Sequence, residues 1–412
     1  MTPDHGSARY WGIAALLAAL AMLGPFSIDA FFPSFHALAA HFALSKWALQ
    51  QTLTAYMLPL SIMSLVQGPL SDAFGRRRVI LGGLALYTVA SVGCALAASF
   101  TTLLVFRAIQ GMSAGAGVIV GRAIIRDLYE GPQAQKLLSL VTMIFGFAPA
   151  VAPVIGGWIH VTLGWRAVFG FMALFSALLA LAAYLTLPET HPVELRARLH
   201  APELTRSAMR VAAHRTFLLL ALAMGANFAA VMVFIGAAPS VVIDHWQLRE
   251  TQFAWLFAPI IGGFILGAWI SGRMAGRVAA ATQCKAGFAF ALAGSGLMVA
   301  LQVMLGALPI LAQQLLLAAI ALGVQLVSPI LVLRMLDLFP RARGAAASVQ
   351  SCVSIVISAA VFGALAPLLS NSLATLAEGS LGAALVSFGL WRSAQHRVSL
   401  AHRPSGNDTK TL

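Results

Sequence analysis

The residue of this 412-residue chain best suited to proton chemistry is an isolated acid in an apolar stretch. Asp29 follows an uncharged run from Trp11 to Phe26 and is the only carboxylate clearly within a predicted membrane helix. An ionised Asp at the centre of a membrane helix costs about 2.5–3.5 kcal/mol on insertion scales, so such residues usually serve a function. Because a low dielectric favours the neutral acid, Asp29 can exchange a proton near neutral pH. The alternative is an interfacial Asp near the outer end of its helix.

A second costly charge lies in the stretch expected to form the fourth membrane helix. Arg107 falls a short way into an otherwise uncharged segment, and Gln110 follows one helical turn later. A guanidinium in such a place must pair, face water or extend to the membrane surface. The position of Arg107 in the sequence allows either extension to the surface or a place facing a cavity.

Elements long enough to cross a membrane must position these residues. Hydrophobic residues make up 60% of the chain and charged residues 9%, whereas a soluble domain carries about 25% charged residues. A helix needs roughly 20 apolar residues to span a bilayer, and the alternating ten-residue segments of a porin-like barrel do not occur. The sequence therefore predicts an all-α membrane protein with twelve helices. They are expected near residues 10–32, 47–70, 79–98, 101–125, 136–160, 164–187, 216–240, 250–273, 283–306, 309–335, 343–368 and 371–392.

The predicted helices divide into two bundles of six. Residues 1–187 are expected to form the first bundle, 188–215 a cytoplasmic linker, 216–392 the second bundle and 393–412 a cytoplasmic tail. A weak repeat supports this division, because Gly-Arg at residues 75–76 recurs at residues 276–277, after the eighth helix. Evenly spaced helices could produce the same offset by coincidence, whereas two parallel halves around a central cavity are an established transporter plan.

The formal net charge of +13 follows from asymmetric loops. Of the 26 Lys and Arg residues, only Lys46, Arg166 and Arg249 fall in odd-numbered loops, and Arg107 and Arg334 fall within or at the edge of helices. The other 21 lie on the side of both termini and the linker. Because basic loops stay in the cytoplasm, we predict a multi-pass protein of the inner membrane with both termini cytoplasmic. We do not expect a nucleic-acid partner, because the basic residues lie in short loops between apolar segments and do not form a basic face on a soluble fold.

The strongest motif is the loop after the second helix, GPLSDAFGRRR at residues 68–78. It resembles the loop motif of the major facilitator superfamily. Gly68 would allow a helix to approach closely and Gly75 a tight turn, while Asp72 can pair with Arg76 and face the positive end of a helix. The resemblance implies that Asp127, below the fourth helix, joins a gating network with them. An ordinary cluster of cytoplasmic arginines would explain the bases but not the spacing of Gly and Asp.

Two further motifs resemble the same superfamily. Arg107 and Gln110 match its pattern on the fourth helix, which implies that they face the cavity and tune the proton exchange of Asp29. The fifth helix resembles the antiporter motif of the exporting branches, and its two prolines would kink the helix. Ala152 replaces the glycine that usually precedes the second proline. The matching residues of this antiporter motif are Gly146, Pro149, Pro153, Gly156 and Gly157.

The residues around Asp29 resemble one branch of this superfamily in particular. The segment SIDAFFP at residues 27–33 looks like the first-helix signature of the bicyclomycin and chloramphenicol (Bcr/CflA) resistance exporters, within the twelve-helix drug:proton antiporters. Residues 165–169 and 187–190, around the sixth helix, are similar to that branch as well. The resemblance implies proton-coupled export of small drug-like molecules by alternating access. An exporter of an endogenous metabolite or amino acid from the same superfamily is the alternative.

Other classes of function fit less well. A primary pump would need a phosphate-binding loop, and a polytopic membrane enzyme would need clustered catalytic groups such as His-Glu-x-x-His. We therefore expect no enzyme activity, cofactor or metal, and a monomer whose partners are small molecules, protons and the lipid bilayer. Side chains that could form an adaptable, mostly apolar cavity wall are Phe26, Phe32, Tyr56, Met143, Phe147, Asn227, Phe234 and Phe362.

Overall fold

The computed structural model describes residues 8–196, 201–306 and 308–401. Within these ranges no β-strand occurs, and twelve helical segments are long and apolar enough to cross a membrane. The predicted all-α membrane fold is thereby confirmed. Helices follow from the sequence because lipid offers no water to the backbone, and a helix satisfies its N–H and C=O groups internally.

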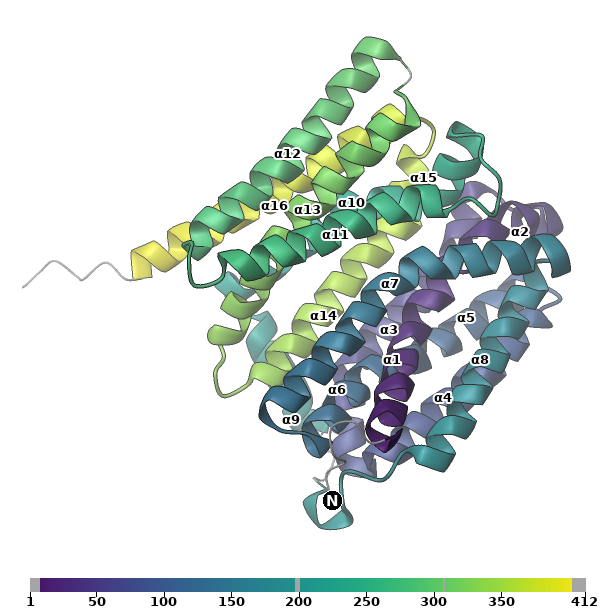
Figure 1. The fold of residues 1–412 in the computed structure, drawn as a ribbon, viewed down its shortest axis with the longest axis vertical. Coiled ribbons are helices and arrows are strands. Elements are labelled where there is room, and N and C mark those ends of the chain that lie inside the picture. The colour runs from purple at the N-terminus through teal and green to yellow at the C-terminus, as the bar shows by residue number, and fades with distance from the viewer. Residues whose placement is uncertain (1–7, 197–200, 307, 402–412) are drawn as a thin grey trace, which may run out of the picture.

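The first bundle occupies one side of the molecule, drawn from purple to blue-green in Figure 1. Its helices are α1 (Ala8–Asp29), α2 (Phe35–Phe42), α3 (Lys46–Phe74), α4 (Arg76–Ala95), α5 (Phe100–Ala114), α6 (Ala116–Leu128), α7 (Gly131–Leu163) and α8 (Trp165–Thr186). Within this bundle α7 packs along α1, α8 along α4, and α5 along α3. The functional side chains predicted for the first half therefore lie on neighbouring helices.

The second bundle lies beside the first and is drawn from green to yellow in Figure 1. Its helices are α10 (Arg215–Gly236), α11 (Ala254–Met274), α12 (Ala280–Leu305), α13 (Ile310–Asp337), α14 (Arg343–Ala360), α15 (Ala366–Leu369) and α16 (Leu373–Ala401), with π-helical turns at Ser240–His245 and Val361–Leu365. Here α16 packs along α10, and α13 packs against both α11 and α12. Two six-helix bundles result, as the sequence predicted.

The first membrane span is interrupted at the acid that the sequence singles out. Asp29 is the last residue of α1, and a 3-10 turn over Phe32–Ser34 leads into α2. Pro33 contributes to this break, because proline has no backbone N–H to donate. The apolar segment continues to Phe42. Asp29 therefore lies at an interruption within a long span, not in the middle of a regular helix.

The linker and the last helix differ from the expected boundaries. The polar stretch predicted as a plain linker contains the helix α9 (Ala201–Ala212). Its formation follows from the spacing of Leu204, Ala208 and Val211, which places three apolar side chains on one helical face. The last helix, α16, continues to Ala401, and residues 402–412 of the predicted tail lie outside the described residues.

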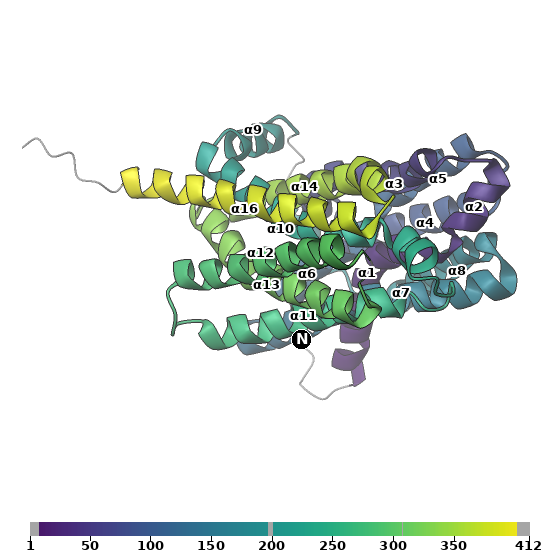
Figure 2. The same ribbon diagram turned by 90° about the horizontal axis from the view of Figure 1, so that it is seen from above.

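We call the end of the molecule that carries the loop at Gly75 and the linker the linker end, and the opposite end the distal end. Hydrogen bonds join the bundles near the distal end, where Gln50 Nε2 donates to Gly236 O at 2.9 Å and Gln51 Nε2 donates to Gly363 O at 3.2 Å. Helix α3 of the first bundle packs along α14 of the second. At the linker end, α9 packs against α14 and lies at the edge of the molecule in Figure 2.

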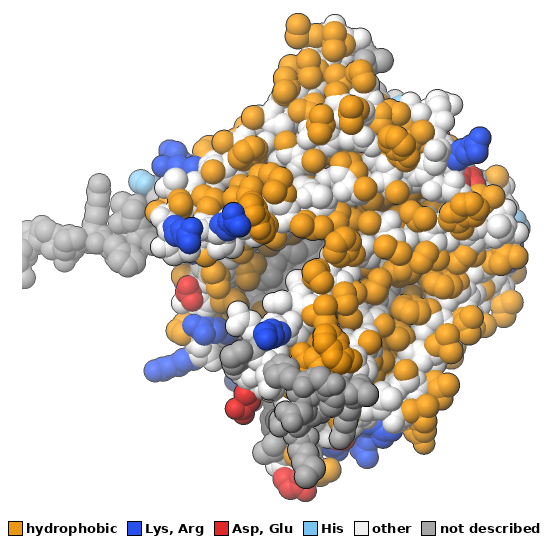
Figure 3. All heavy atoms as spheres, viewed as in Figure 1, with side chains coloured by type: hydrophobic (Ala, Val, Ile, Leu, Met, Phe, Trp, Pro, Cys, Tyr) orange, Lys and Arg blue, Asp and Glu red, His pale blue; other side chains and the backbone are white. Residues whose placement is uncertain are grey.

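The surface agrees with a protein that spans a bilayer. Hydrophobic side chains cover the flank of both bundles in Figure 3, whereas most of the visible Lys and Arg side chains gather toward one end. An exposed apolar surface of this extent suits contact with lipid, because polar groups in the hydrocarbon region are costly. The fold thus places charged loops at the ends and the rare buried charges inside.

Candidate functional site

Arg107 lies at the centre of the first bundle with its side chain 0% exposed. Its Nε donates to Thr52 O at 3.2 Å, and its Nη1 donates to Ser27 O at 3.0 Å and to Gln110 Oε1 at 2.7 Å. These acceptors come from α3, α1 and α5, so one guanidinium joins three helices. The side chain therefore does not extend to the membrane surface.

Aromatic rings complete the surroundings of this guanidinium. Its carbon lies 4.6 Å from the ring centroid of Tyr56, 5.5 Å from Phe31 and 6.0 Å from Phe169. Among the described residues, no carboxylate lies within ion-pair distance, and Nη2 has no hydrogen-bond partner. Carbonyl dipoles and aromatic faces therefore hold the charge, and a desolvated cation–π contact stabilises it by about 2 kcal/mol.

Asp29 is 5% exposed and lies two residues beyond the Ser27 carbonyl that Arg107 binds. In the part of the chain that the structure describes, neither a hydrogen bond nor an ion pair reaches its carboxyl group. Arg107 is therefore not expected to act on the proton exchange of Asp29 through a direct ion pair. It would act through the backbone of α1, because it binds the carbonyl of Ser27. A buried carboxyl group without a cation partner favours its neutral form.

Further polar groups connect to this centre, and sequence reasoning missed them. Gln110 Nε2 donates to Ser91 Oγ at 2.8 Å. Ser27 Oγ donates to Leu23 O at 2.7 Å and contacts the hydroxyl of Tyr87. Tyr87 and Ser91 were detectable as polar residues in the uncharged stretch that forms α4, one turn apart. They extend the polar centre from α5 to α4.

The antiporter motif of α7 separates into residues in close contact and residues in open space. A Cβ at Gly156 would collide with the carbonyl oxygen of Ala30, and one at Gly157 would collide with the carbonyl oxygen of Glu250 in the second half. A Cβ at Gly146 would meet nothing within 4 Å. Pro149 and Pro153 lie inside the helix, between these positions. The Gly-Gly pair therefore touches both the segment beside Asp29 and the second bundle.

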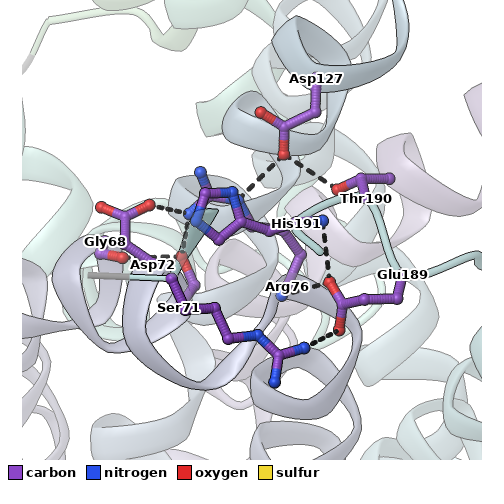
Figure 4. Close-up of polar contacts among 9 residues, drawn as sticks. Gly68, Ser71, Asp72, Arg76, Asp127, Glu189, Thr190 and His191 are labelled. Carbon is purple, nitrogen blue, oxygen red and sulfur yellow. Dashed lines mark hydrogen bonds and ion pairs between the residues drawn. The ribbon is translucent and has the colours of Figure 1, made fainter. Parts of the chain in front are cut away.

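The loop motif forms an ion network at the linker end (Figure 4). Arg76 pairs with Asp72, its Nε donates to Asp127 Oδ2 at 3.1 Å, and its Nη1 donates to Ser71 Oγ at 2.6 Å. Thr190 Oγ1 donates to the same Asp127 oxygen at 2.9 Å. All these groups belong to the first bundle or to the segment just after it. The structure thus joins Asp72, Arg76 and Asp127 without bridging the two halves.

Glu189 adds a part that the motif did not predict. Its Oε1 accepts from the backbone N–H of Arg76 at 2.9 Å, and its Oε2 lies 3.7 Å from Arg196 Nη2. Gly75, with φ of 96°, brings the backbone so close that a Cβ would collide with Glu189, which explains the glycine. Gly68 does not permit an unusually close helix approach, because its Cβ would lie 3.9 Å from Ile119, an ordinary contact.

A polar cluster at the distal end joins the two bundles. Asp244 Oδ1 lies 3.0 Å from His36 Nε2, and its Oδ2 accepts from Lys46 Nζ at 3.2 Å. His160 Nε2 lies 3.4 Å from Glu250 Oε2. Burial raises the pKa of Asp244, but the hydrogen bonds and charges of His36 and Lys46 outweigh it and hold this pKa below its usual range. The first bundle thus contributes the bases and the second the acids.

The candidate cavity residues do not form one wall. Phe26 packs on Phe171 and Phe175, and Asn227 Nδ2 donates to Val324 O within the second bundle. Phe32, Tyr56, Phe234 and Phe362 are also buried. Met143 and Phe147 are 54% and 44% exposed on α7. Within the described residues, no group of three His, Cys, Asp or Glu side chains is placed to hold a metal ion.

Comparison with known proteins adds relatives to this geometry. Residues 15–363 match the Major Facilitator Superfamily. The uncharacterized MFS-type transporter YdgK of Bacillus subtilis is 31% identical, over 77% of this chain and 79% of that protein. The bicyclomycin resistance protein homolog of Haemophilus influenzae is 31% identical, over 65% and 68%. The chloramphenicol resistance protein of Pseudomonas aeruginosa is 29% identical, over 74% and 74%.

Solved structures resemble this fold at low sequence identity. The crystal structure of a D-xylose-proton symporter has a TM-score of 0.70 at 14% identity and covers 92% of this chain and 97% of its own. A bacterial homolog of the human lysosomal transporter Spinster, in an inward-facing and unoccupied conformation, has a TM-score of 0.68 at 17% identity and covers 98% and 100%. At these identities the likeness concerns the fold.

Proposed function

Because this chain belongs to the major facilitator superfamily, we propose that it exports small drug-like molecules in exchange for protons by alternating access. The family agrees with the resemblance carried by the loop motif of residues 68–78. Relatives named for bicyclomycin and chloramphenicol resistance support drug-like substrates over an endogenous metabolite. Alternating access in this fold uses two bundles that rock about a site near the midplane.

One observation carries the proposal. Gly156 of the antiporter motif packs directly on Ala30, the residue after the buried Asp29, while Gly157 packs on Glu250 of the second bundle. Close packing transmits small displacements, because cores resist compression. A change of charge at Asp29 would therefore act on α7 and, through α7, on the contact between the bundles. This arrangement supports coupling of a proton to the movement of the halves.

The cycle follows from the two buried charges. Asp29 would take a proton from the distal side and release it to the more alkaline side at the linker end. Arg107 keeps its charge throughout, held by carbonyls and rings, and favours the carboxylate when the Asp29 segment moves toward it. Asp29 is the only buried acid among the described residues, which supports one proton per cycle.

The orientation in the membrane follows from the basic loops. The linker end carries most Lys and Arg residues and would lie in the cytoplasm with both termini, since positive loops stay inside. The protein would then be a multi-pass monomer of the inner membrane. A reporter fused within the linker, after Arg196, is expected to give a cytoplasmic signal, and a periplasmic signal would reverse this orientation.

The proposal is tested first by drug susceptibility of a sensitive host with and without the gene. Expression should raise the inhibitory concentration of at least one compound in a panel of small antibiotics. Purified protein in detergent should release a proton when such a compound binds, and the Asp29→Asn variant should not. An Asn variant that still releases protons and concentrates substrate would make Asp29 a structural residue, and no resistance to any compound would favour a metabolite as substrate.

A further inference from the structure

The linker helix α9 has two faces with different surroundings. Val211 is 1% exposed and belongs to the same apolar cluster as Phe217 and Met335 of the second bundle, with Ala208 packed against it. Contacts with α14 hold this inner face. The helix is therefore fixed to the second bundle and does not hang as a free connection.

The outer face carries two arginines that pair with no acid in the described part of the chain. Arg206 and Arg210 are exposed one helical turn apart, and Met209 between them is 66% exposed. Together with Pro202, Thr205 and Ala213 they form an open, shallow surface. Neither arginine forms an ion pair with a carboxylate among the described residues. Like charges at this spacing repel one another on a helix, so an anionic partner would relieve them.

The position of α9 determines which anions it can meet. The helix ends at Ala212, and the membrane span of α10 begins at Arg215. Three residues of chain reach at most about 10 Å, which is comparable to the headgroup layer on one side of a bilayer, about 5–7 Å thick. The partner of α9, α14, begins at Arg343 at the same end, and Figure 2 shows α9 at the edge of the molecule beside α14.

We propose that α9 is an interfacial helix whose outer face binds the phosphate groups of anionic phospholipids in the leaflet at the linker end. The guanidinium groups of Arg206 and Arg210 can bind phosphate oxygens through paired hydrogen bonds. Their aliphatic stems and Met209 suit the boundary between headgroups and acyl chains. Basic residues next to a membrane span are attracted to anionic lipid in this way.

Lipid binding at α9 would affect the contact between the two bundles, because α9 packs on α14 and α14 packs along α3 of the first bundle. Lipid bound at α9 would hold α14 at the membrane surface while the first bundle moves. Anionic lipid would thereby bias which arrangement of the bundles is populated, since a ligand shifts a conformational equilibrium by its differential affinity. Lipid binding at α9 does not depend on the identity of the exported compound.

Hydrogen exchange of the full-length protein tests this binding. The protein is placed in bilayers of phosphatidylcholine alone or of phosphatidylcholine with phosphatidylglycerol, and exchange is followed for residues 201–213. We expect phosphatidylglycerol to slow exchange of this segment several-fold, and high salt to remove the difference because it screens surface charge. Equal exchange in the two bilayers would overturn the proposal.

Two variants make the test specific to the outer face. Arg206→Gln combined with Arg210→Gln should abolish the lipid-dependent protection, whereas Arg277→Gln, an exposed arginine in the loop after α11, should retain it. Exchange in α10 and α13 reports whether each variant is folded. Lipid-dependent protection that persists in the folded double variant, or is lost equally in Arg277→Gln, would overturn the assignment of the site to α9.

Discussion

Arg107 shows how a buried charge is held in this protein without a carboxylate partner. Its acceptors are two backbone carbonyls and the Gln110 amide, and the faces of Tyr56 and Phe31 cover the guanidinium. The planar guanidinium group has five N–H donors and can therefore bind several acceptors at once. Because Arg107 does not neutralise Asp29 through an ion pair, the protonation of that acid can change during the cycle.

Arg107→Lys should therefore abolish most transport, although it preserves the charge. An ammonium cannot reach the acceptors on Thr52, Ser27 and Gln110 together, and each lost hydrogen bond to a charged group costs about 1.5–3 kcal/mol. We expect a clearly lower melting temperature in detergent and at least a tenfold loss of drug-driven proton release. Arg166→Lys, an exposed arginine over Trp165, is the matched control. Equal melting temperatures and equal rates of proton release in the two variants would show that the hydrogen bonds of the Arg107 guanidinium are not required.

At this scale the sequence could predict which charges matter but not what holds them. Asp29 and Arg107 were identifiable because charges are rare in apolar stretches. The carbonyls of Ser27 and Thr52 were not, since every residue has a carbonyl and only the tertiary structure selects these two. The absence of an ion pair between Asp29 and Arg107, within the described residues, is likewise a property of the tertiary structure.

The helix α7 connects the buried acid to the second bundle. Gly156 faces Ala30 beside Asp29, and Gly157 faces Glu250. The glycines leave no room for a side chain at either contact, so α7 fits closely against α1 and against the loop before α11. The prolines between Gly146 and Gly156 remove backbone donors from the same helix, which makes this segment the place where α7 can bend.

Gly156→Ala should consequently damage transport far more than Gly146→Ala. The added Cβ would collide with backbone atoms of Ala30, and overpacking of this kind costs about 1–3 kcal/mol. Gly146→Ala should be neutral or stabilising by up to about 1 kcal/mol, since its Cβ meets open space within a helix. Thermal unfolding and substrate-driven proton release measure both. A Gly146 variant as damaging as the Gly156 variant would show that packing against α1 is not the cause.

Helices were predictable to different degrees for physical reasons. The twelve membrane spans follow from apolar length alone, because a bilayer of fixed thickness demands it. The helix α9 was missed, since its composition is polar and its one apolar face becomes stable only against α14. The motif of α7 was predicted as a unit, but the difference between Gly146 and Gly156 depends on which helix lies opposite each of them.

The whole molecule has its two bundles in contact at the distal end, while the ion network of the loop motif stays within the first bundle and the segment after it. We expect Asp72 to engage the second bundle when the linker end closes. Its side chain is 45% exposed although it pairs with Arg76. The network would then stabilise the state that is open on the distal side.

Asp72→Asn should lower transport while leaving the amount of protein in the membrane nearly unchanged. The Asp72 side chain is 45% exposed and stays solvated without its partner, and the buried Arg76 keeps its contacts with Asp127 and Ser71. Glu130→Gln removes an exposed acid at the same end that forms no ion pair with a described residue, and it should transport normally. The measurement is the efflux rate of each variant, normalised to the amount of protein in the membrane. An unaltered rate for Asp72→Asn would exclude a gating role.

The distal contact makes the converse prediction, that Asp244→Asn opens the distal end. Asp244 is the acid that His36 and Lys46 share across the bundles. Its replacement leaves the pair of His160 and Glu250 and the bond from Gln50 to Gly236, so the shift should be partial. Removal of two such pairs, each worth about 0.2–1 kcal/mol, changes the ratio of open to closed molecules by up to about thirtyfold.

Spin labels at Trp47 and Asn371, in a variant without the native cysteines, would report this distance between the bundles. Asp244→Asn should increase the population at long distances, whereas Glu378→Gln, an exposed acid of α16, should not. The pH dependence has a definite sign. Because the pKa of Asp244 is lowered in the closed state, the bridge is fully present above the usual Asp value of about 3.9 and is lost as the pH falls through the lowered pKa. The unaltered protein should therefore keep its short distance from neutral pH down to about pH 5, and a lengthening within that range would show that another group controls the distal contact.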